Sequence, residues 1–159
     1  MFRIERLQDQ PQAFIDEAVS FFWKQWGTEQ NAAFYRDCIV HAMQPDIDVP
    51  RFYVALEREH DLMVGMCAVL RNDLISRQDL FPWLACLYVN PAYRGQGLGS
   101  SLMEHAAAEL REHGHAQLFL STTLDGYYER YGWHYFSPGY YTDGSATKIY
   151  RISLKGEDA

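Results

Sequence analysis

The chain has 159 residues, of which 48% are hydrophobic and 22% are charged, and this composition predicts one folded domain over residues 1–159 with disorder only around residues 156–159. Its formal net charge of −7 disfavours nucleic acid as a partner, because such binding needs clustered Lys and Arg, and it favours a cationic small substrate. No apolar run approaches the ~20 residues that span a bilayer, and the N-terminus lacks a signal-peptide core, so we expect a cytoplasmic protein without a membrane partner.

The first third of the chain predicts one strand followed by two helices. Phe2 to Arg6 alternates apolar and charged residues, as a half-buried strand does. From Pro11 to Trp26 the apolar residues recur at the spacing of a helical face, and Gly27 is a plausible stop. Asn31 to Met43 predicts a second helix with an apolar side.

The middle of the chain predicts three strands. Phe52 to Glu57 and Leu62 to Leu70 are joined by a polar turn, which indicates a hairpin. A polar connection, Asn72 to Pro82, follows. Trp83 to Val89 is a nearly continuous apolar run, as expected of a strand buried on both faces.

The last third alternates helices and strands. Leu98 to His113 carries an apolar stripe at a spacing of four residues and predicts a helix. Gln117 to Thr122 predicts a strand, and Asp125 can cap a short helix at Tyr127 to Tyr131. The two final strands are expected at residues 133–137 and 148–154, with a Pro/Gly/Tyr-rich loop between them.

The resulting order is β-α-α-β-β-β-α-β-α-β-β. The strand–helix–strand unit at its centre predicts a parallel pair, since a crossover helix joins parallel strands. The other connections suit a mixed sheet with helices on both faces. The three cysteines, Cys38, Cys67 and Cys86, lack a CxxC pair, so we expect no disulfide and no metal site and interpret all three as core residues.

The stretch Arg94-Gly95-Gln96-Gly97-Leu98-Gly99 lies between a buried strand and a helix. The first N–H groups of a helix have no internal partner and attract anions, and glycines let the backbone approach a ligand closely. A phosphate or diphosphate therefore fits this loop. A P-loop is disfavoured because no Lys follows the glycines, and a dinucleotide fingerprint because Ser100 stands where its third Gly or Ala belongs.

The stretch Leu87-Tyr-Val-Asn-Pro-Ala-Tyr-Arg-Gly-Gln-Gly-Leu-Gly-Ser100 closely resembles the acetyl-CoA signature of the GCN5-related N-acetyltransferase (GNAT) family. The resemblance implies a mostly antiparallel sheet of about seven strands, with the parallel pair at the cofactor site. It implies transfer of an acetyl group from acetyl-CoA to a primary amine of a small molecule or peptide by direct attack, with coenzyme A as product. The implied cofactor-binding residues are Leu87, Tyr88, Val89, Arg94, Gly95, Gln96, Gly97, Leu98, Gly99, Ser100 and Tyr128.

The segment Tyr127-Tyr-Glu-Arg-Tyr-Gly-Trp133 is similar to a second family motif. By that match Tyr128 is the catalytic residue that faces the coenzyme sulfur and supplies a proton or hydrogen bond, although it could also be an aromatic packing residue. The match assigns the backbone N–H groups of Leu87, Tyr88 and Val89 to the acyl oxygen. The family's Asn after the fifth strand is missing here, where Ser121-Thr122-Thr123 stands.

Attack requires a neutral amine, so a base or a water chain is needed to remove its proton. Asp73 and Asp79 precede the central strand and are the leading candidates, against the alternative that both are solvated loop carboxylates; His134 is a further candidate. Specificity is expected from residues 26–31, 72–83 and 138–146. The candidate acceptor-binding residues are Trp26, Asp73, Asp79, Trp83 and Tyr140, with Phe81 and Tyr141 as further aromatic residues; the alternative is that several of the aromatic residues belong to the core.

Three alternatives share this fold. A sensor would bind acyl-CoA without turnover, a scaffold would have lost the ligand, and another acyltransferase would use a longer acyl group or a hydroxyl acceptor. The candidate acid Tyr128 argues against the sensor, and the intact Arg94, Gly97 and Gly99 argue against the scaffold. Homodimers are common in the family, but no pattern in this sequence marks an interface.

Overall fold

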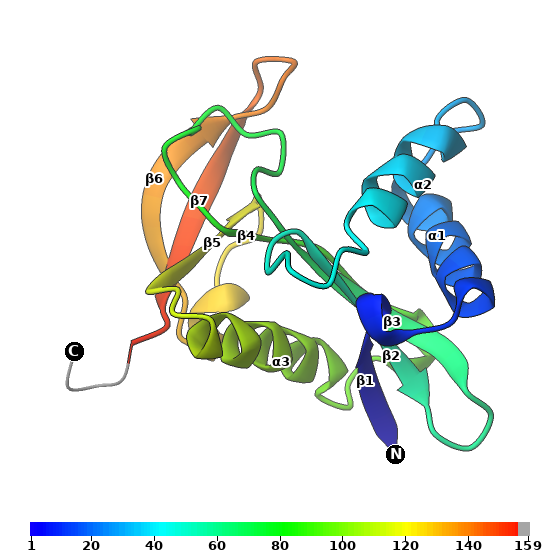
Figure 1. The fold of residues 1–159 in the computed structure, drawn as a ribbon. Coiled ribbons are helices and arrows are strands. Elements are labelled where there is room, and N and C mark those ends of the chain that lie inside the picture. Colours follow the sequence, from blue (N-terminus) through cyan, green and yellow to red (C-terminus); the bar gives the residue numbers. More distant parts are fainter. Residues whose placement is uncertain (156–159) are drawn as a thin grey trace.

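A computed structural model describes residues 1–155 and shows one seven-stranded mixed sheet with helices on both faces (Figure 1), as the sequence predicts. The expected disorder at residues 156–159 lies outside the described residues. The strands, in the sheet order β1-β2-β3-β4-β5-β7-β6, are β1 Phe2–Arg6, β2 Arg51–Glu57, β3 Leu62–Leu70, β4 Trp83–Val89, β5 Gln117–Thr122, β7 Ala146–Ser153 and β6 His134–Tyr140. The helices are α1 Gln12–Trp26, α2 Ala32–His41 and α3 Leu98–Glu112, with short 3-10 turns at Leu7–Asp9, Pro91–Tyr93 and Tyr128–Tyr131. Only β4 and β5 are parallel among these described strand pairs.

The structure corrects the predicted elements at three places. Strand β6 runs on to Tyr140, because Pro138 lies in an edge strand, where a missing N–H is tolerated. Residues 128–131 form a single 3-10 turn, and Asp125 does not cap it but pairs with Lys148 instead. Cys38 is exposed on α2 rather than in the core, whereas Cys67 is buried and Cys86 half-buried.

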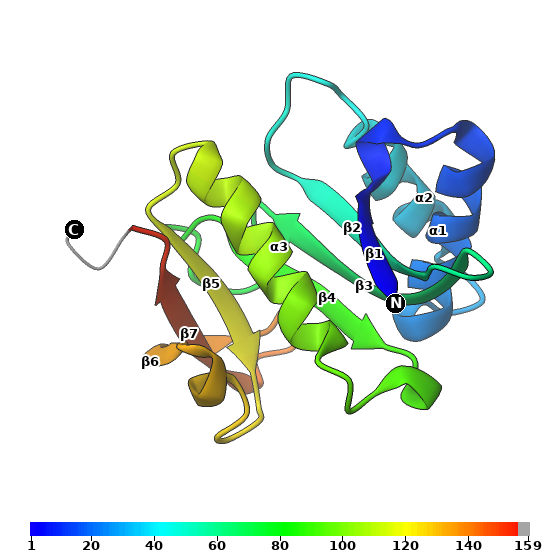
Figure 2. The same ribbon diagram turned by 90° about the horizontal axis from the view of Figure 1, so that it is seen from below.

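Strand β2 explains why helices cover both faces of the sheet. Its side chains alternate, so Phe52 and Val54 pack against α1 and α2 whereas Tyr53 and Ala55 pack on the side of α3. Figures 1 and 2 show α1 and α2 on one face and α3 crossing the other. No helix among residues 1–155 is both long and apolar enough to cross a membrane.

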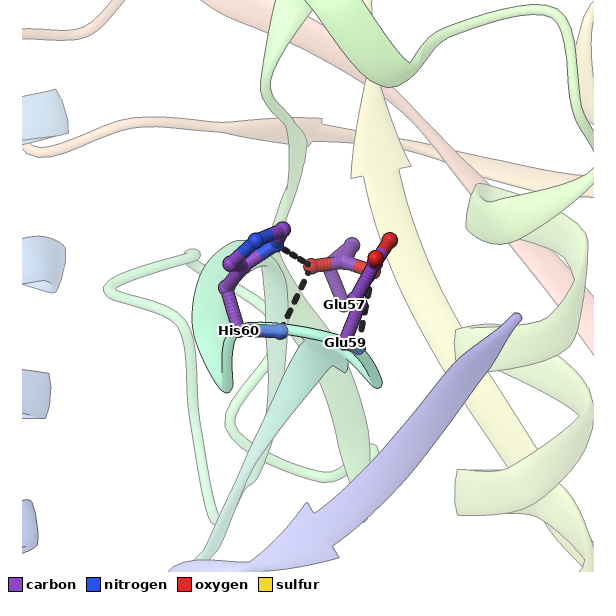
Figure 3. Close-up of side chains that lie close together, drawn as sticks. All are labelled: Glu57, Glu59 and His60. Carbon is purple, nitrogen blue, oxygen red and sulfur yellow. Dashed lines mark hydrogen bonds and ion pairs between the residues drawn. The ribbon is translucent and has the colours of Figure 1, made fainter.

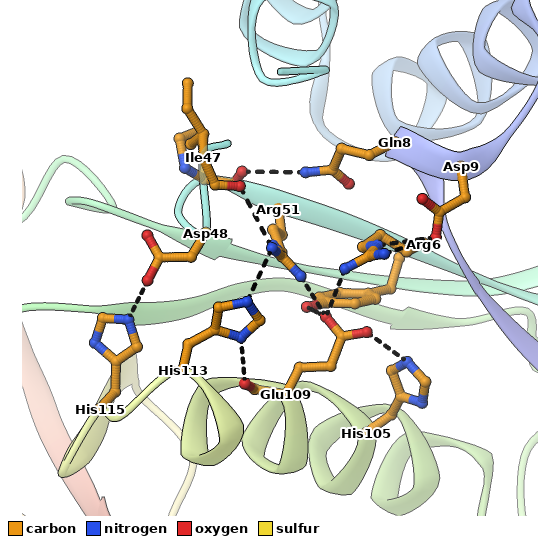
Figure 4. A network of polar contacts seen from close by, with 12 residues as sticks. Arg6, Gln8, Asp9, Ile47, Asp48, Arg51, His105, Glu109, His113 and His115 are labelled. Atoms are coloured by element: carbon orange, nitrogen blue, oxygen red, sulfur yellow. Dashed lines mark hydrogen bonds and ion pairs between the residues drawn. The ribbon is translucent and has the colours of Figure 1, made fainter. Parts of the chain in front are cut away.

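Helix α3 is fixed to β1 and β2 by a polar network around Glu109 (Figure 4). Its carboxylate accepts hydrogen bonds from Arg51 at 3.0 Å and from the Tyr53 hydroxyl at 2.6 Å, and Arg6 lies 3.9 Å away. Burial acts to raise the pKa of Glu109, but hydrogen bonds from His105, Tyr53 and Arg51 outweigh it and hold that pKa at about 2. The network sets the position of the helix whose N-terminus is described below.

The turn between β2 and β3 is closed by Glu57 (Figure 3). One carboxylate oxygen accepts the N–H of Glu59 at 2.8 Å, and the other accepts the N–H of His60 at 3.0 Å and lies 3.1 Å from its imidazole Nδ1. These three side chains gather atoms of the kind that bind metals. The bonds within the turn account for the position of the Glu57 side chain at the end of β2.

The connection between β3 and β4 lies along the β6–β7 hairpin. Ser76 donates its N–H to the carbonyl of Tyr140 at 2.9 Å, and Ile75 forms a bridge with Tyr141. Ile75 is buried with Trp83 and other side chains in a separate apolar cluster. This packing holds residues 72–82 against the C-terminal half of the sheet.

Strand β4 is irregular in its second half. The register with β3 shifts between Met66 and Ala68, and Cys86 on the opposite strand has a φ of 55°, which indicates a β-bulge. The paired register of β4 and β5 is confined to Trp83 opposite Phe119, so residues 84–89 have no partner strand on that side. Residues 86–89 are consequently half-buried, which corrects the expectation that the whole strand is buried on both faces.

Candidate active site

The loop after β4 is shaped by local hydrogen bonds and by two glycines. The Asn90 side chain accepts the N–H of Ala92 at 3.0 Å and starts the turn at residues 91–93. Arg94 then donates from Nε to the carbonyl of Val89 at 2.8 Å. Gly95 and Gly97 have φ values of 77° and 78°, a region that L side chains rarely adopt, so the chain can reverse here before α3.

The N-terminus of α3 is open to a ligand. Gly97 is the N-cap and offers no side chain, and the first turn contains no acidic residue. The first helical hydrogen bond runs from the N–H of Ser101 to the carbonyl of Gly97 at 3.0 Å. The N–H groups of residues 98–100 come before it and are left without a partner inside the helix. These N–H groups and the helix dipole make the position suitable for an anion.

A groove of about 430 Å³ lies along this loop. Ten of the sequence-predicted cofactor residues line it, namely Leu87, Tyr88, Val89, Arg94, Gly95, Gly97, Leu98, Gly99, Ser100 and Tyr128. Gln96 does not, because it points to a separate hollow beside Phe2 and Ser101. Sequence reasoning missed four lining residues, Tyr93, Leu124, Tyr127 and Tyr131. The repeated tyrosines of residues 127–131 were a sequence signal that could have identified Tyr127 and Tyr131.

Tyr128 lies in the 3-10 turn at the end of this groove. Its ring packs edge-on against Tyr127 and Trp133, with centroids 4.8 Å and 6.3 Å away. Burial, followed by the neighbouring Tyr127, raises its pKa to about 12. Its hydroxyl has no hydrogen-bond partner among residues 1–155 and remains protonated at neutral pH.

A second cavity of about 450 Å³ opens on the other side of Leu87 and Tyr128, which line both spaces. The three segments expected to set specificity each contribute a lining residue, Trp26, Asp73 and Tyr141. The remaining lining residues are Tyr35, Leu84, Ala85, Cys86, Leu120 and Ser121. The two cavities therefore meet beside the irregular half of β4.

The two candidate bases differ sharply in their surroundings. Asp73 lines the second cavity, and burial raises the pKa of its carboxyl to about 6. Within residues 1–155 this carboxylate forms neither an ion pair nor a hydrogen bond. Asp79 lies outside both cavities and pairs with Arg77 at 2.7 Å, and the hydrogen bond from Arg77 lowers the pKa of Asp79 to about 2. The structure thus brings Asp73 to the site and leaves Asp79 at the surface.

The other expected acceptor residues are also separated by the fold. Trp26 lines the second cavity, but Trp83 is fully buried, and its indole N–H donates to the carbonyl of Leu80 at 2.7 Å. Tyr140 is 52% exposed and lines neither cavity, because its neighbour Tyr141 takes the inward position in the hairpin. His134 is exposed on β6 and lines neither cavity.

Comparisons with known proteins agree with this architecture. The profile of the "Acetyltransferase (GNAT) domain" family matches residues 48–135, which is more than half of the chain. A search of curated proteins returned no significant match.

Three solved structures show the same fold. A putative GNAT acetyltransferase from Desulfovibrio desulfuricans is 18% identical, with 98% of this chain and 100% of that chain covered and a TM-score of 0.70. An aminoglycoside 6'-N-acetyltransferase complexed with coenzyme A is 13% identical, with 98% of each chain covered and a TM-score of 0.73. The ribosomal-protein-S18-alanine N-acetyltransferase from Escherichia coli is 18% identical, with 100% and 99% covered and a TM-score of 0.66.

Proposed function

Since the chain belongs to the GNAT family of acetyltransferases, we propose that it transfers an acetyl group from acetyl-CoA to the primary amine of a small molecule or peptide. One observation carries this proposal. The groove with the open helix N-terminus and the cavity with the unpaired carboxylate share Leu87 and Tyr128, so a donor and an acceptor can meet there. Coenzyme A is bound in one structural neighbour, and another acts on an alanine, in agreement with this reading.

The groove fits the diphosphate of acetyl-CoA. The N–H groups of residues 98–100 would donate to its oxygens, and Arg94 would add a positive charge beside them. A Cβ at Gly97 would meet nothing within 4 Å, so this glycine is required by its φ and not by lack of space. The bound cofactor supplies an activated acyl thioester.

Asp73 is the proposed acceptor of the proton from the ammonium form of the substrate. An aspartate with a pKa of about 6 is a stronger base than an ordinary one and is still ionised at neutral pH. Apolar lining side chains that displace water from the bound amine would lower the pKa of its ammonium, whereas the ion pair with Asp73 would raise it. Asp73 and Leu87 line the same cavity, so the proton acceptor and the proposed site of attack share one space.

Two groups would stabilise the charges that develop during transfer. The edge of β4 without a partner strand presents the backbone of Leu87, Tyr88 and Val89, whose N–H groups are the proposed donors to the acyl oxygen. The Tyr128 hydroxyl is the proposed donor to the leaving sulfur. With a pKa of about 12 against roughly 8.5 for a thiol, Tyr128 would hydrogen bond to the thiolate without fully protonating it.

The proposal is tested by binding and turnover in sequence. Calorimetric titration with acetyl-CoA, a longer acyl-CoA and ATP should give the highest affinity for acetyl-CoA, and thiol release should then follow when amines are added. Binding without thiol release for any amine would favour a sensor. Tighter binding and faster turnover of a longer acyl-CoA would show that the transferred group is a longer acyl group and not acetyl.

A further inference from the structure

The second cavity contains a single charge among its described lining residues. Asp73 is the only carboxylate there, and no Lys, Arg or His lines the cavity. Two other carboxylates discussed above are neutralised locally, Asp79 by Arg77 and Glu109 by Arg51. Asp73 forms no ion pair within residues 1–155, although it is half-buried. The cavity therefore offers one position for one cation.

Most of the other lining side chains are apolar or aromatic, and Ser121 adds an uncharged hydroxyl. Trp26 is 43% exposed and extends from the end of α1, with its ring edge-on to Tyr88 at 6.3 Å. Tyr141 also lines the cavity, and a 3.0 Å hydrogen bond from its hydroxyl to Thr147 holds its side chain. Leu84, Ala85, Leu87 and Leu120 contribute aliphatic lining. An aromatic or aliphatic body attached to the amine would bury its surface against these side chains.

We propose that the acceptor is a small monoamine with an apolar or aromatic body, whose ammonium pairs with Asp73 and whose body packs between Trp26 and Tyr141. This inference rests on the proposed function and names its substrate class. A polyamine or aminoglycoside would leave further ammonium groups without a carboxylate, and a cation–π contact with Trp26 compensates only part of the lost hydration. An amino acid would place its own carboxylate near Asp73 with no cation in the wall to receive it.

The test compares acceptors that differ in one feature. Initial rates of thiol release at saturating acetyl-CoA are measured for 2-phenylethylamine, for phenylalanine, for spermidine, for an aminoglycoside and for a tetra-alanine amide. We expect kcat/KM for 2-phenylethylamine to exceed each of the others at least tenfold. A higher kcat/KM for phenylalanine, spermidine, the aminoglycoside or the peptide overturns the inference and leaves the proposed function intact. No turnover of any amine, with acetyl-CoA still bound, refutes the proposed function itself.

Two variants test the residues that carry the inference. Trp26→Ala should raise KM for 2-phenylethylamine about tenfold at an unchanged Kd for acetyl-CoA, whereas Tyr135→Ala, an exposed aromatic residue on β6, should leave KM unchanged. Asp73→Asn should slow the turnover of both amines. It should also reduce the preference for 2-phenylethylamine over phenylalanine, because Asp73 no longer repels the carboxylate of phenylalanine. An unaltered preference in Asp73→Asn, or an unaltered KM in Trp26→Ala, contradicts the assignment.

Discussion

Arg94 donates a 2.8 Å hydrogen bond from Nε to the backbone carbonyl of Val89 and so ties the glycine loop to the last residue of β4. The guanidinium also lies over the ring of Tyr88, with its Cζ 5.7 Å from the ring centroid. The contacts orient the side chain along the groove that we assign to acetyl-CoA. Arg94 thus both fixes the conformation of the loop and adds a positive charge to the groove.

Replacing Arg94 by Gln should weaken acetyl-CoA binding about 10- to 100-fold, since a charge-assisted hydrogen bond to phosphate contributes about 1.5–3 kcal/mol. Calorimetric titration measures this change. Arg111→Gln is the matched control, because Arg111 makes the same kind of contact, from Nε to the carbonyl of Leu154 at 2.7 Å, at the far end of α3. Equal loss of affinity in both variants would show that the effect is structural.

Tyr128→Phe should lower kcat by ~10 to 1,000-fold and leave the Kd for acetyl-CoA within about threefold, because only the donor to the leaving sulfur is lost. Since the pKa of Tyr128 is about 12, no decline of kcat from its ionisation is expected below about pH 11. Pre-steady-state and steady-state rates check both points. Tyr135→Phe, at an exposed position, serves as the control, and an unchanged kcat in Tyr128→Phe removes this residue from the mechanism.

Asp73 should confer an acidic limb on the kcat/KM profile with a pKa near 6, because the protonated carboxyl cannot accept a proton. Asp73→Asn should abolish that limb and reduce kcat/KM at least tenfold. Asp79→Asn is the matched control, since its carboxylate pairs with Arg77 outside the site. If both variants keep the wild-type profile, neither aspartate is the base.

The raised pKa of Asp73 makes the stability of the fold depend on pH. The folded pKa of Asp73, about 6, lies above the ordinary value of 3.8, so its stabilising contribution is present below about pH 4 and is lost as pH rises through 6. At pH 8 Asp73→Asn should therefore raise the free energy of unfolding by about 1–3 kcal/mol, from roughly two pKa units at 1.36 kcal/mol each. Denaturant unfolding at pH 4 and pH 8 measures the difference, and a variant that is less stable at pH 8 contradicts it.

Glu109→Gln should destabilise the fold by about 3 kcal/mol at neutral pH, because Arg51, which is 6% exposed, loses its charged partner. In the native protein the pKa of about 2, against the usual 4.5, means that this stability is present above about pH 4.5 and is lost as pH falls towards 2. Thermal or urea unfolding of Glu109→Gln and of the exposed Glu104→Gln on the same helix provides the comparison. Equal stability of the two variants would refute the role of the network.

Features that depend on local sequence were predictable. The alternation in Phe2–Arg6 predicts a strand, and the glycines at 95 and 97 predict a tight loop. The structure confirms the strand and the positive φ of both glycines. The choice between Asp73 and Asp79, or between Tyr140 and Tyr141, depends on the packing of one loop on a distant hairpin, through the bridge from Ile75 to Tyr141. Such a contact leaves no periodic signal.

Burial misled the sequence reasoning in two opposite cases. Trp83 was expected to bind the acceptor, but it is fully buried beside Phe119, where β4 meets β5. Cys38 was expected in the core, but it lies on the exposed side of α2, because only Ile39 and Ala42 near it are buried. The roles of the cofactor and acceptor residues remain predictions, and each has a test above.

The central claim is that the N-terminus of α3 binds the diphosphate of acetyl-CoA. Ser100 lines the groove in the first turn, whereas Ser101 points away to the hollow beside Phe2. A carboxylate added at either position interacts favourably with the positive end of the helix dipole. Ser100→Asp and Ser101→Asp should therefore both remain folded, with Tm unchanged or raised. Calorimetric titration with acetyl-CoA should show at least a 30-fold loss of affinity for Ser100→Asp and less than about fivefold for Ser101→Asp, because only the first charge faces the phosphates. Wild-type affinity in a folded Ser100→Asp would contradict the account.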